Sequence, residues 1–470
     1  MDPILYWNDV ALEANRVSHT NGKGEQTGPT LSSRALAIVH LAMYDAYAGV
    51  IKDPVNLPPY LPGLPPPAPG ASANGAVAAA AHATLSQLFP SQKAFFDLKH
   101  LQAGLQGPGL PQGHDFGLLV AQKLLADRKN DPGASDNGYS FSVARGAHRP
   151  DPDNPNQGFH APFYGALSKG FAITCRHELD TPPQPGSADY LSALQQVRAK
   201  GIAPELTGTL PPGSPARTPE ETLIGLFWAY DGAFGLGTPP RLYNQIVRKV
   251  AIAKGNTVAQ NARLFALVNV AMGDSGILAW DQKYIHDLWR PVLGVREHDG
   301  SMGPTGASDP AFSANCDPFW LPLGAPKTNS PSQEKNFTPN FPAYPSGHAT
   351  FGAAALYITR LFYGVTTPGP DNLFSGLTFV SEELNGINKD NKGTVRSKHV
   401  RTFAGGLWQM IVENGLSRVY LGVHWVFDAF AVDDNGNPDS FQNIGGAPLG
   451  IKIAEDIFNS GMKPSPVGPR

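Results

Sequence analysis

Long segments of this chain repeat apolar side chains at helical spacing, and almost none alternates with the period of two that half-buried strands need. Residues 31–50 show the pattern clearly, and Ser32 or Ser33 stands where a helix N-cap belongs. The other segments expected to be helical are 73–89, 91–106, 114–129, 187–200, 218–230, 238–254, 257–285, 346–364, 398–418, 422–431 and 449–460. A short hairpin is expected around 429–442. The pattern therefore predicts an all-α fold of two helical bundles with long loops and a few short strands.

Two stretches rich in proline and glycine separate the helical segments. Residues 57–69 (LPPYLPGLPPPAP) cannot form a helix, and residues 130–185 are expected to form a long loop wrapped over the bundle. Because 470 residues exceed the size of one simple core, we expect two packed units. Residues 1–215 would form an N-terminal bundle that serves as scaffold and entrance. Residues 216–470 would form the bundle that carries the functional site.

An internal echo supports two related bundles. Residues 38–45 (IVHLAMYD) resemble residues 267–274 (LVNVAMGD), and each segment lies inside a long apolar helix. Common helix composition explains so short an echo equally well.

The charge balance excludes several classes of protein. Charged residues make up only 16% of the chain and the net charge is -3, which argues against a general nucleic-acid binder. No uninterrupted apolar run reaches the roughly 18 residues of a membrane span. The N-terminus lacks the basic and apolar regions of a signal peptide, so a cytoplasmic location is the default expectation. The two cysteines, Cys175 and Cys316, are expected to be small buried apolar side chains.

Three short motifs in the second half carry an unusual density of positive charge. They are Lys283-(six residues)-Arg290-Pro291, Pro345-Ser346-Gly347-His348, and Ser417-Arg418-(five residues)-His424-(three residues)-Asp428. Together they offer three cations, two imidazoles, a hydroxyl and a glycine N–H group. Such a set suits a tetrahedral or trigonal oxyanion.

The first motif allows two geometries. If the helix ending near residue 285 continues, the seven residues from Lys283 to Arg290 turn about 700° and return both cations to one face. Pro291 disfavours helical geometry at Arg290, so Arg290 alternatively lies in the segment that leaves the helix. Trp280 stands three residues before Lys283 and shares its face.

The second motif is typical of a helix start that binds an anion. Pro345 suits the first turn of a helix, and Ser346, Gly347 and His348 are expected to follow in that turn. Unpaired N–H groups and the positive end of the helix dipole favour an anion there.

The third motif predicts an oriented imidazole. Gly422 is expected to end the helix that contains Arg418, and a new helix from about Val423 would place His424 and Asp428 on one face. The carboxylate would then fix the ring tautomer and leave one nitrogen free to bond or coordinate. A zinc pair at this spacing is an alternative, but no third ligand group accompanies it.

In this order the three motifs resemble the signature shared by vanadium-dependent haloperoxidases and the acid phosphatases of the type 2 phosphatidic acid phosphatase superfamily. Further segments look like the fungal vanadium chloroperoxidases. They are 227–247, 318–326, 341–352, 381–388, 417–428 and 445–464. The similarity covers most of residues 220–465, whereas residues 1–215 show only general compatibility.

This resemblance implies a role for each site residue. His424 would be the metal ligand of a vanadate cofactor and Asp428 its orienting partner. The oxygens of vanadate would be bound by Lys283, Arg290, Arg418, Ser346 and the Gly347 N–H. His348 would be the acid–base group, and Lys283 and His424 would also act in catalysis. Asp231 would pair with Arg418. Trp280 and Phe341 would shape the halide pocket.

The implied reaction is the oxidation of chloride, bromide and iodide by hydrogen peroxide to hypohalous acid, which then halogenates small organic acceptors. The alternative within the same superfamily is an acid phosphatase acting through a phosphohistidine at His424. A non-enzymatic anion-binding module would need the cations but not His348. Because such oxidants are usually made outside cells, secretion is the alternative to a cytoplasmic location.

Overall fold

Nearly all regular elements of the computed structural model are helices, joined by long loops, and the structure describes residues 2–308, 311–433 and 436–470. The α-helices are α1 (Pro3–Ser18), α2 (Gly28–Ile51), α3 (Ala73–Leu88), α4 (Lys93–Gln102), α5 (Leu110–Asp127), α6 (Tyr164–Leu167), α7 (Ala188–Lys200), α8 (Pro219–Phe227), α9 (Pro239–Ala253), α10 (Val258–His286), α11 (Pro291–Arg296), α12 (Gly347–Phe362), α13 (Gly406–Tyr420) and α14 (Gly446–Ser460). Short 3₁₀ helices are η1 (Pro90–Gln92), η2 (Pro204–Thr209), η3 (Glu382–Leu384) and η4 (Val426–Asp428). Strands β1 (Ala431–Val432) and β2 (Pro438–Asp439) pair antiparallel. The all-α prediction and the expected short hairpin are confirmed, although residues 434–435 of the hairpin lie outside the described residues.

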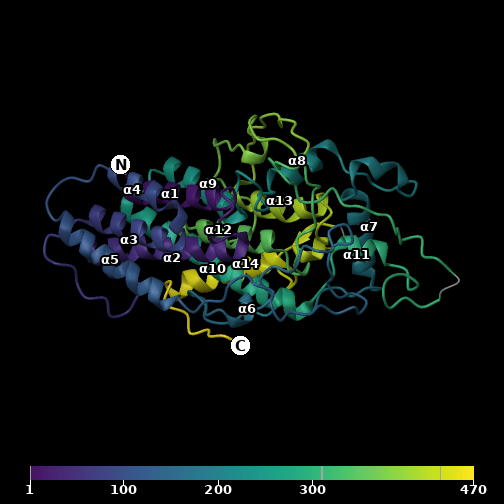
Figure 1. Ribbon diagram of the computed structural model, residues 1–470, viewed down its shortest axis with the longest axis horizontal. Coiled ribbons are helices and arrows are strands. Elements are labelled where there is room, and N and C mark those ends of the chain that lie inside the picture. Colours follow the sequence, from purple (N-terminus) through teal and green to yellow (C-terminus); the bar gives the residue numbers. More distant parts are fainter. Residues whose placement is uncertain (1, 309–310, 434–435) are drawn as a thin grey trace.

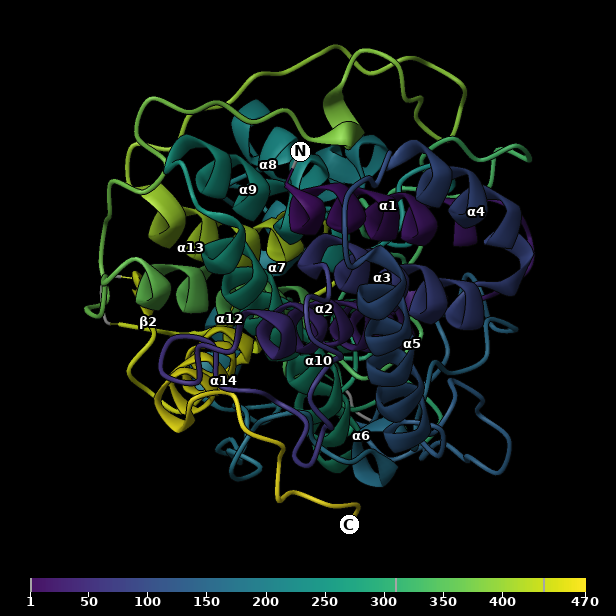
Figure 2. The same ribbon diagram turned by 90° about the vertical axis from the view of Figure 1, so that its left-hand side faces the viewer.

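Helices α2 and α10 form the centre of the molecule and pack against each other (Figure 2). Helix α10 also contacts α12, α14 and α6, while α2 contacts α3 and α5. By length and composition both central helices could cross a membrane. However, 78% of the apolar window of α2 and 94% of that of α10 are buried inside the protein. A helix that is apolar on every face belongs in such a core.

The two echoing segments, 38–45 and 267–274, lie in α2 and α10 and end on buried aspartates with a common task. Each carboxylate accepts backbone N–H groups from a distant loop. The donors are Tyr60 and Leu61 for Asp45, at 2.7 and 2.9 Å, and Phe171, Ala172 and Ile173 for Asp274, at 2.6, 2.8 and 3.0 Å. Burial raises the pKa of Asp45 to about 7 and that of Asp274 to about 6. Each aspartate thus ties a loop to the helical core.

The long loop over residues 130–185 contains only the short helix α6, and it runs beneath the central helices in Figure 1. One continuous hydrophobic cluster includes buried side chains of α1, α2 and α3 together with those of α10, α12 and α14. The two halves of the chain therefore share a core. The division at residue 215 stays a prediction.

Several local predictions are wrong. The helix expected at 422–431 is instead an extended segment followed by η4, because Gly422 takes a left-handed φ of 73° and Trp425 an extended conformation. The helix expected at 398–418 begins only at Gly406, since the residues before it pair with another loop through the bridge between Phe379 and Arg401. Of the two cysteines expected to be buried, Cys175 is exposed and Cys316 is buried.

Candidate active site

The chemical groups of the three motifs come together where α12 begins and where α10 and α13 end. Lys283 lies in the last turn of α10, Arg290 is the N-cap of α11, Ser346 is the N-cap of α12, Arg418 lies in the last turn of α13, and His424 and Asp428 follow Gly422. All of these side chains are buried. Arg290 takes extended geometry (φ -77°, ψ 158°), as the alternative based on Pro291 predicted, and does not continue the helix.

The start of α12 differs by one position from the prediction. Pro345 precedes the helix, Ser346 caps it by accepting a hydrogen bond from the Ala349 N–H at 3.4 Å, and Gly347 and His348 form its first turn. The Ser346 N–H donates to the Asp428 carbonyl at 2.7 Å, which joins the second motif to the third. A Cβ atom at Gly347 would lie 3.3 Å from the Trp280 ring. The absence of a side chain there lets the helix start approach this ring closely.

Lys283 is buried among backbone carbonyls. Its Nζ donates to the carbonyls of Pro342 and Ala343 at 2.9 and 3.1 Å, and also to that of Pro345. Burial, followed by repulsion from Arg290, holds the pKa of Lys283 well below its usual value. Nζ lies 5.1 Å from the centre of the Phe341 ring. Lys283 therefore positions the segment that leads into α12 and places a cation behind it.

The tautomer of His424 follows from its two neighbours. Nη1 of Arg290 lies 2.9 Å from Nε2 of His424, and a guanidinium can only donate, so Nε2 must carry a lone pair. The proton of the neutral ring is therefore on Nδ1, which donates to Oδ2 of Asp428 at 2.7 Å. Burial and the charge of Arg290 hold the pKa of His424 well below its usual value. Burial raises the pKa of Asp428 to about 7.

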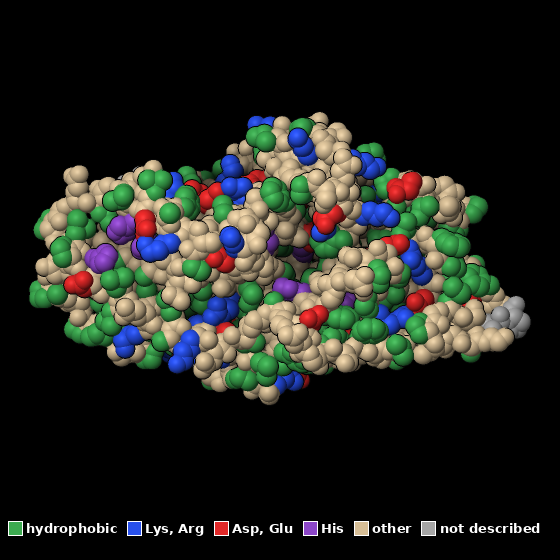
Figure 3. Space-filling view, viewed as in Figure 1, with side chains coloured by type: hydrophobic (Ala, Val, Ile, Leu, Met, Phe, Trp, Pro, Cys, Tyr) green, Lys and Arg blue, Asp and Glu red, His purple; other side chains and the backbone are tan. Residues whose placement is uncertain are grey.

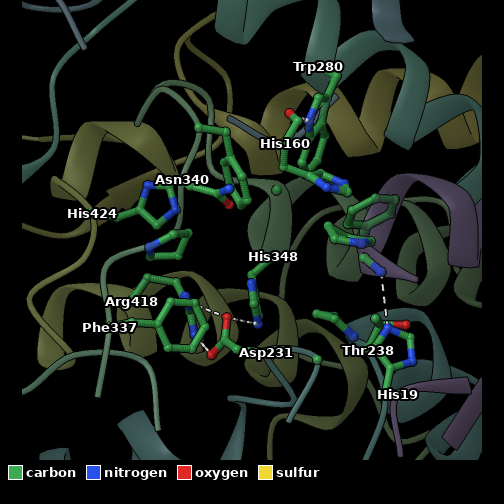
Figure 4. A pocket seen from close by; sticks show the side chains of 18 residues that line it. His19, His160, Asp231, Thr238, Trp280, Phe337, Asn340, His348, Arg418 and His424 are labelled. Carbon is green, nitrogen blue, oxygen red and sulfur yellow. Dashed lines mark hydrogen bonds and ion pairs between the residues drawn. The ribbon is translucent and has the colours of Figure 1, made fainter. Parts of the chain in front are cut away.

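His348 is also a neutral ring with a defined tautomer. Its Nε2 lies 2.7 Å from the Ala229 carbonyl, which can only accept, so the proton is on Nε2 and Nδ1 carries the lone pair. Burial, followed by the charge of Arg418, lowers the pKa of His348 to about 4. A neutral imidazole of this kind can accept a proton. Asp231 lies nearby, with Oδ1 3.8 Å from Nε2 (Figure 4).

Arg418 and Asp231 form a buried bidentate ion pair. Nη2 and Nη1 of Arg418 donate to Oδ1 and Oδ2 of Asp231 at 2.7 and 3.0 Å. This pairing fixes the plane of the guanidinium beside His348.

A cavity of about 220 Å³ lies in front of these groups. Its polar side includes His348, His424, Arg418 and Asp231, and its lining also includes the aromatic rings of Trp280, Phe337, Phe341 and Phe351. The Trp280 and Phe341 rings are 4.8 Å apart between centroids. The space-filling view shows histidine side chains within a hollow near the middle of the molecule (Figure 3). Lys283, Arg290 and Ser346 lie behind this cavity and are not part of its lining.

The first half of the chain contributes to the cavity through residues that sequence reasoning did not identify: His19, Gly28, Pro29 and His160. His160 contacts the aromatic wall of the cavity directly. Its carbonyl accepts hydrogen bonds from Trp280 Nε1 at 3.1 Å and from the Tyr284 hydroxyl at 2.9 Å, and its ring packs against Trp280 and Phe341. No spacing or motif marks His160, because its partners lie more than 100 residues away in the sequence.

The buried charges fit a multiply charged oxyanion. Within the described parts of the chain, the carboxylates that act on the three cations Lys283, Arg290 and Arg418 are Asp231 and Asp428. Among the described residues, Nη2 of Arg290 and Nε of Arg418 have no hydrogen-bond partner although both atoms are buried. Buried donors and charges of this kind are costly unless a partner compensates them. Vanadate offers the negative charge and acceptor oxygens that this set lacks.

Comparisons with known proteins decide between the activities of the superfamily. Residues 1–157 match the family described as the vanadium chloroperoxidase N-terminal domain, and residues 263–438 match the VCPO second helical-bundle domain. The chain is 38% identical to the vanadium chloroperoxidase of Curvularia inaequalis in a match covering 98% of this chain and 90% of that protein. This chain belongs to the vanadium chloroperoxidase family. It is a vanadium-dependent haloperoxidase, an enzyme that uses vanadate and hydrogen peroxide to oxidise halide.

Solved structures of bacterial enzymes share the fold of this family member. A bacterial vanadium-dependent iodoperoxidase matches with a TM-score of 0.65 at 18% identity, over 96% of this chain and 95% of that chain. The holo form of a bacterial vanadium-dependent chloroperoxidase matches with a TM-score of 0.59 at 15% identity, over 95% and 96% of the two chains. The family resemblance is confirmed. It also extends over residues 1–157, for which only general compatibility was expected.

Proposed function

We propose that this haloperoxidase oxidises chloride as well as bromide and iodide, and that the buried cation cluster in front of Trp280 and Phe341 is its vanadate site. The proposal is supported by two buried guanidinium donors without partners beside a cavity with an apolar wall: Nε of Arg418, which lines the cavity, and Nη2 of Arg290, which lies behind it. The hypohalous acid produced would halogenate small organic acceptors in solution.

Vanadate would be held by groups from all three motifs. His424 would ligate it through Nε2, the nitrogen that carries the lone pair, after Arg290 turns from this atom toward the anion. Lys283, Arg290 and Arg418 would neutralise its charge, together with the Ser346 hydroxyl and the Gly347 N–H. When bound, vanadate supplies a Lewis acid that activates hydrogen peroxide without a change in the oxidation state of the metal.

The protein's own side chains would move the proton and shape the halide site. His348 would take a proton from hydrogen peroxide at Nδ1, since its Nε2–H is held by the Ala229 carbonyl. Lys283 would add positive charge beside the oxygen that the halide attacks. Trp280 and Phe341 would remove part of the water shell of the halide, which raises its nucleophilicity.

The two halves of the chain would have different tasks. We propose that residues 216–470 carry the vanadate site, while residues 1–215 provide scaffold and entrance through residues such as Pro29 and His160. The enzyme would act as a soluble protein, since its two long apolar helices are mostly buried in its own core.

Halogenation of monochlorodimedone by the purified protein tests the proposal. Hydrogen peroxide is supplied with chloride or bromide, with and without orthovanadate, and then with excess phosphate as a competing oxyanion. Vanadate-dependent chlorination that phosphate suppresses is expected. Bromination without chlorination under the same conditions would refute chloride competence and leave the family assignment intact.

A further inference from the structure

A cysteine, a histidine and an aspartate from distant parts of the chain meet outside the vanadate site. Cys175 and His177 lie in the loop that follows the Asp274-bound residues, and Asp456 lies on α14. Cys175 is exposed, and none of Cys175, His177 and Asp456 lines the active-site cavity. Within the described residues this is the one group of three or more His, Cys, Asp and Glu side chains whose ligand atoms all lie within 4.8 Å of one another.

The distances in this cluster come close to those between ligands of one small metal ion. Zinc bonds of about 2.3 Å to sulfur and about 2.0–2.1 Å to nitrogen or oxygen give tetrahedral edges of roughly 3.6 Å between S and N and roughly 3.3 Å between N and O. Sγ of Cys175 lies 3.7 Å from Nε2 of His177, close to the first value, and 3.4 Å from Nδ1, so the exposed thiol must rotate toward the Nε2 side of the ring to share an ion with it. Nε2 lies 2.8 Å from Oδ2 of Asp456 as a hydrogen bond, so this edge must open by roughly 0.5 Å.

Two of the three side chains are already held in place. Asp456 is fixed by Thr174, whose backbone N–H and hydroxyl donate to its two oxygens at 2.7 and 2.8 Å. His177 takes a left-handed conformation (φ 45°), which is uncommon for residues other than glycine, and its side chain is 16% exposed. Its ring contacts both the thiol and the carboxylate. The exposed thiol leaves the cluster open to an ion from solvent.

We propose that Cys175, His177 and Asp456 bind a divalent metal ion of the zinc type, with water as the fourth ligand. A thiolate and an imidazole select Zn²⁺, Co²⁺ or Cd²⁺ over Mg²⁺ and Ca²⁺, which prefer oxygen ligands. Binding forms the metal–sulfur and metal–nitrogen bonds, releases the thiol proton to solvent and shifts the ring proton of His177 from Nε2 to Nδ1, so that the imidazole stays neutral. The ion would fasten the 171–179 loop to α14, in addition to the Thr174 contacts. This cation site is separate from the anion site at His424.

Titration of the full-length enzyme with Cd²⁺ tests the proposal, because only sulfur coordination gives the ultraviolet thiolate-to-cadmium charge-transfer band. The enzyme is first freed of metal by a chelator, and Zn²⁺ affinity is measured in parallel by calorimetry. The variants are Cys175→Ser, His177→Gln and Asp456→Asn. Cys316→Ser is the matched control, since it removes the other cysteine, which is buried.

One Cd²⁺ per chain with a charge-transfer band is expected in the wild type and in Cys316→Ser, and Cys175→Ser should abolish the band. His177→Gln and Asp456→Asn should each weaken Zn²⁺ binding at least about tenfold, because losing even an outer partner of a ligand costs 10–100-fold. All variants should keep vanadate-dependent bromination, which shows that they are folded. The absence of a band in the wild type would overturn the proposal. A band in the wild type together with unchanged Zn²⁺ affinity in both His177→Gln and Asp456→Asn would also overturn it.

Discussion

Replacing Asp428 with asparagine should weaken vanadate binding while leaving the geometry of the site intact. Oδ2 of Asp428 accepts both structural hydrogen bonds, from His424 Nδ1 at 2.7 Å and from the Trp425 N–H at 3.0 Å. Oδ1 is buried with no partner among the residues described. An asparagine can therefore keep its oxygen at the Oδ2 position and place its NH₂ group where Oδ1 lies. The substitution removes the negative charge and little else.

The size of the effect follows from what that charge does. When Nε2 of His424 bonds to vanadate, the ring becomes more positive and its Nδ1–H bond to a carboxylate strengthens. Losing such a partner typically costs 10–100-fold in affinity, or about 1.4–2.7 kcal/mol. We expect about tenfold weaker vanadate binding for Asp428→Asn. For Asp428→Ala, which also leaves the His424 and Trp425 donors unpaired, we expect about 100-fold.

The dissociation constant is measured by adding orthovanadate to the metal-free enzyme and following bromination activity or heat release. Asp45→Asn is the matched control, because Asp45 is an equally buried carboxylate of α2 that accepts the backbone N–H groups of Tyr60 and Leu61 and does not line the cavity. Its vanadate affinity should equal that of the wild type. Unchanged affinity in both Asp428 variants would show that this carboxylate does not orient the vanadate ligand.

The same variants predict a pH dependence with a definite sign. Burial raises the pKa of Asp428 to about 7 in the metal-free enzyme, so its carboxylate is charged above that pH and neutral below it. The ratio of dissociation constants between Asp428→Asn and the wild type should therefore be largest above pH 7 and approach one as the pH falls below it. A ratio that does not change between pH 6 and pH 8 would contradict the charge argument.

Three further substitutions test other parts of the structure. His348→Ala should lower the halogenation rate at saturating vanadate by about 10²–10⁴-fold, with vanadate still bound. In the wild type, kcat/KM should fall as the pH drops through about 4, because the neutral His348 ring is lost there. Phe341→His should reduce kcat/KM for chloride about tenfold more than for bromide, as measured with monochlorodimedone, because a polar ring keeps the more strongly hydrated halide in water. Asp274→Ala leaves three backbone N–H groups without their acceptor. The free energy of unfolding, measured by urea titration, should therefore fall by about 3 kcal/mol or more. A loss below about 1 kcal/mol would refute the role of Asp274 in holding the loop.

Much of the site could be predicted from the sequence because its polar groups are local to helix ends. Proline at position 291, a glycine at 347 and a glycine at 422 each mark a place where the chain leaves or enters a helix, and the charged residues stand beside them. The predicted start of α12 differs from the observed one by one residue, because Ser346 is the N-cap and the helix begins at Gly347.

The helix expected at 422–431 shows why the remainder could not be predicted. Its apolar residues, such as Val423 and Phe427, have helical spacing, yet they are buried on all sides by tertiary contacts. Periodicity records burial on one face and cannot distinguish that from complete burial of an extended segment. The extended backbone lets the Val423 carbonyl accept from Arg290 Nη1 at 2.7 Å while the adjacent His424 ring faces the same guanidinium.

The cavity wall also explains why the two halves of the chain must act together. Trp280 and Tyr284 both donate to the carbonyl of His160, so the aromatic face of α10 is positioned by a residue of the long 130–185 loop. That loop is in turn held to α10 by Asp274, about two and a half helical turns before Lys283. Helix α10 thus carries the loop anchor Asp274, the cavity-wall residue Trp280 and the cation Lys283 along its length. The motifs of the second half are sufficient to recognise an oxyanion site, but its apolar side is complete only when the first half is folded against it.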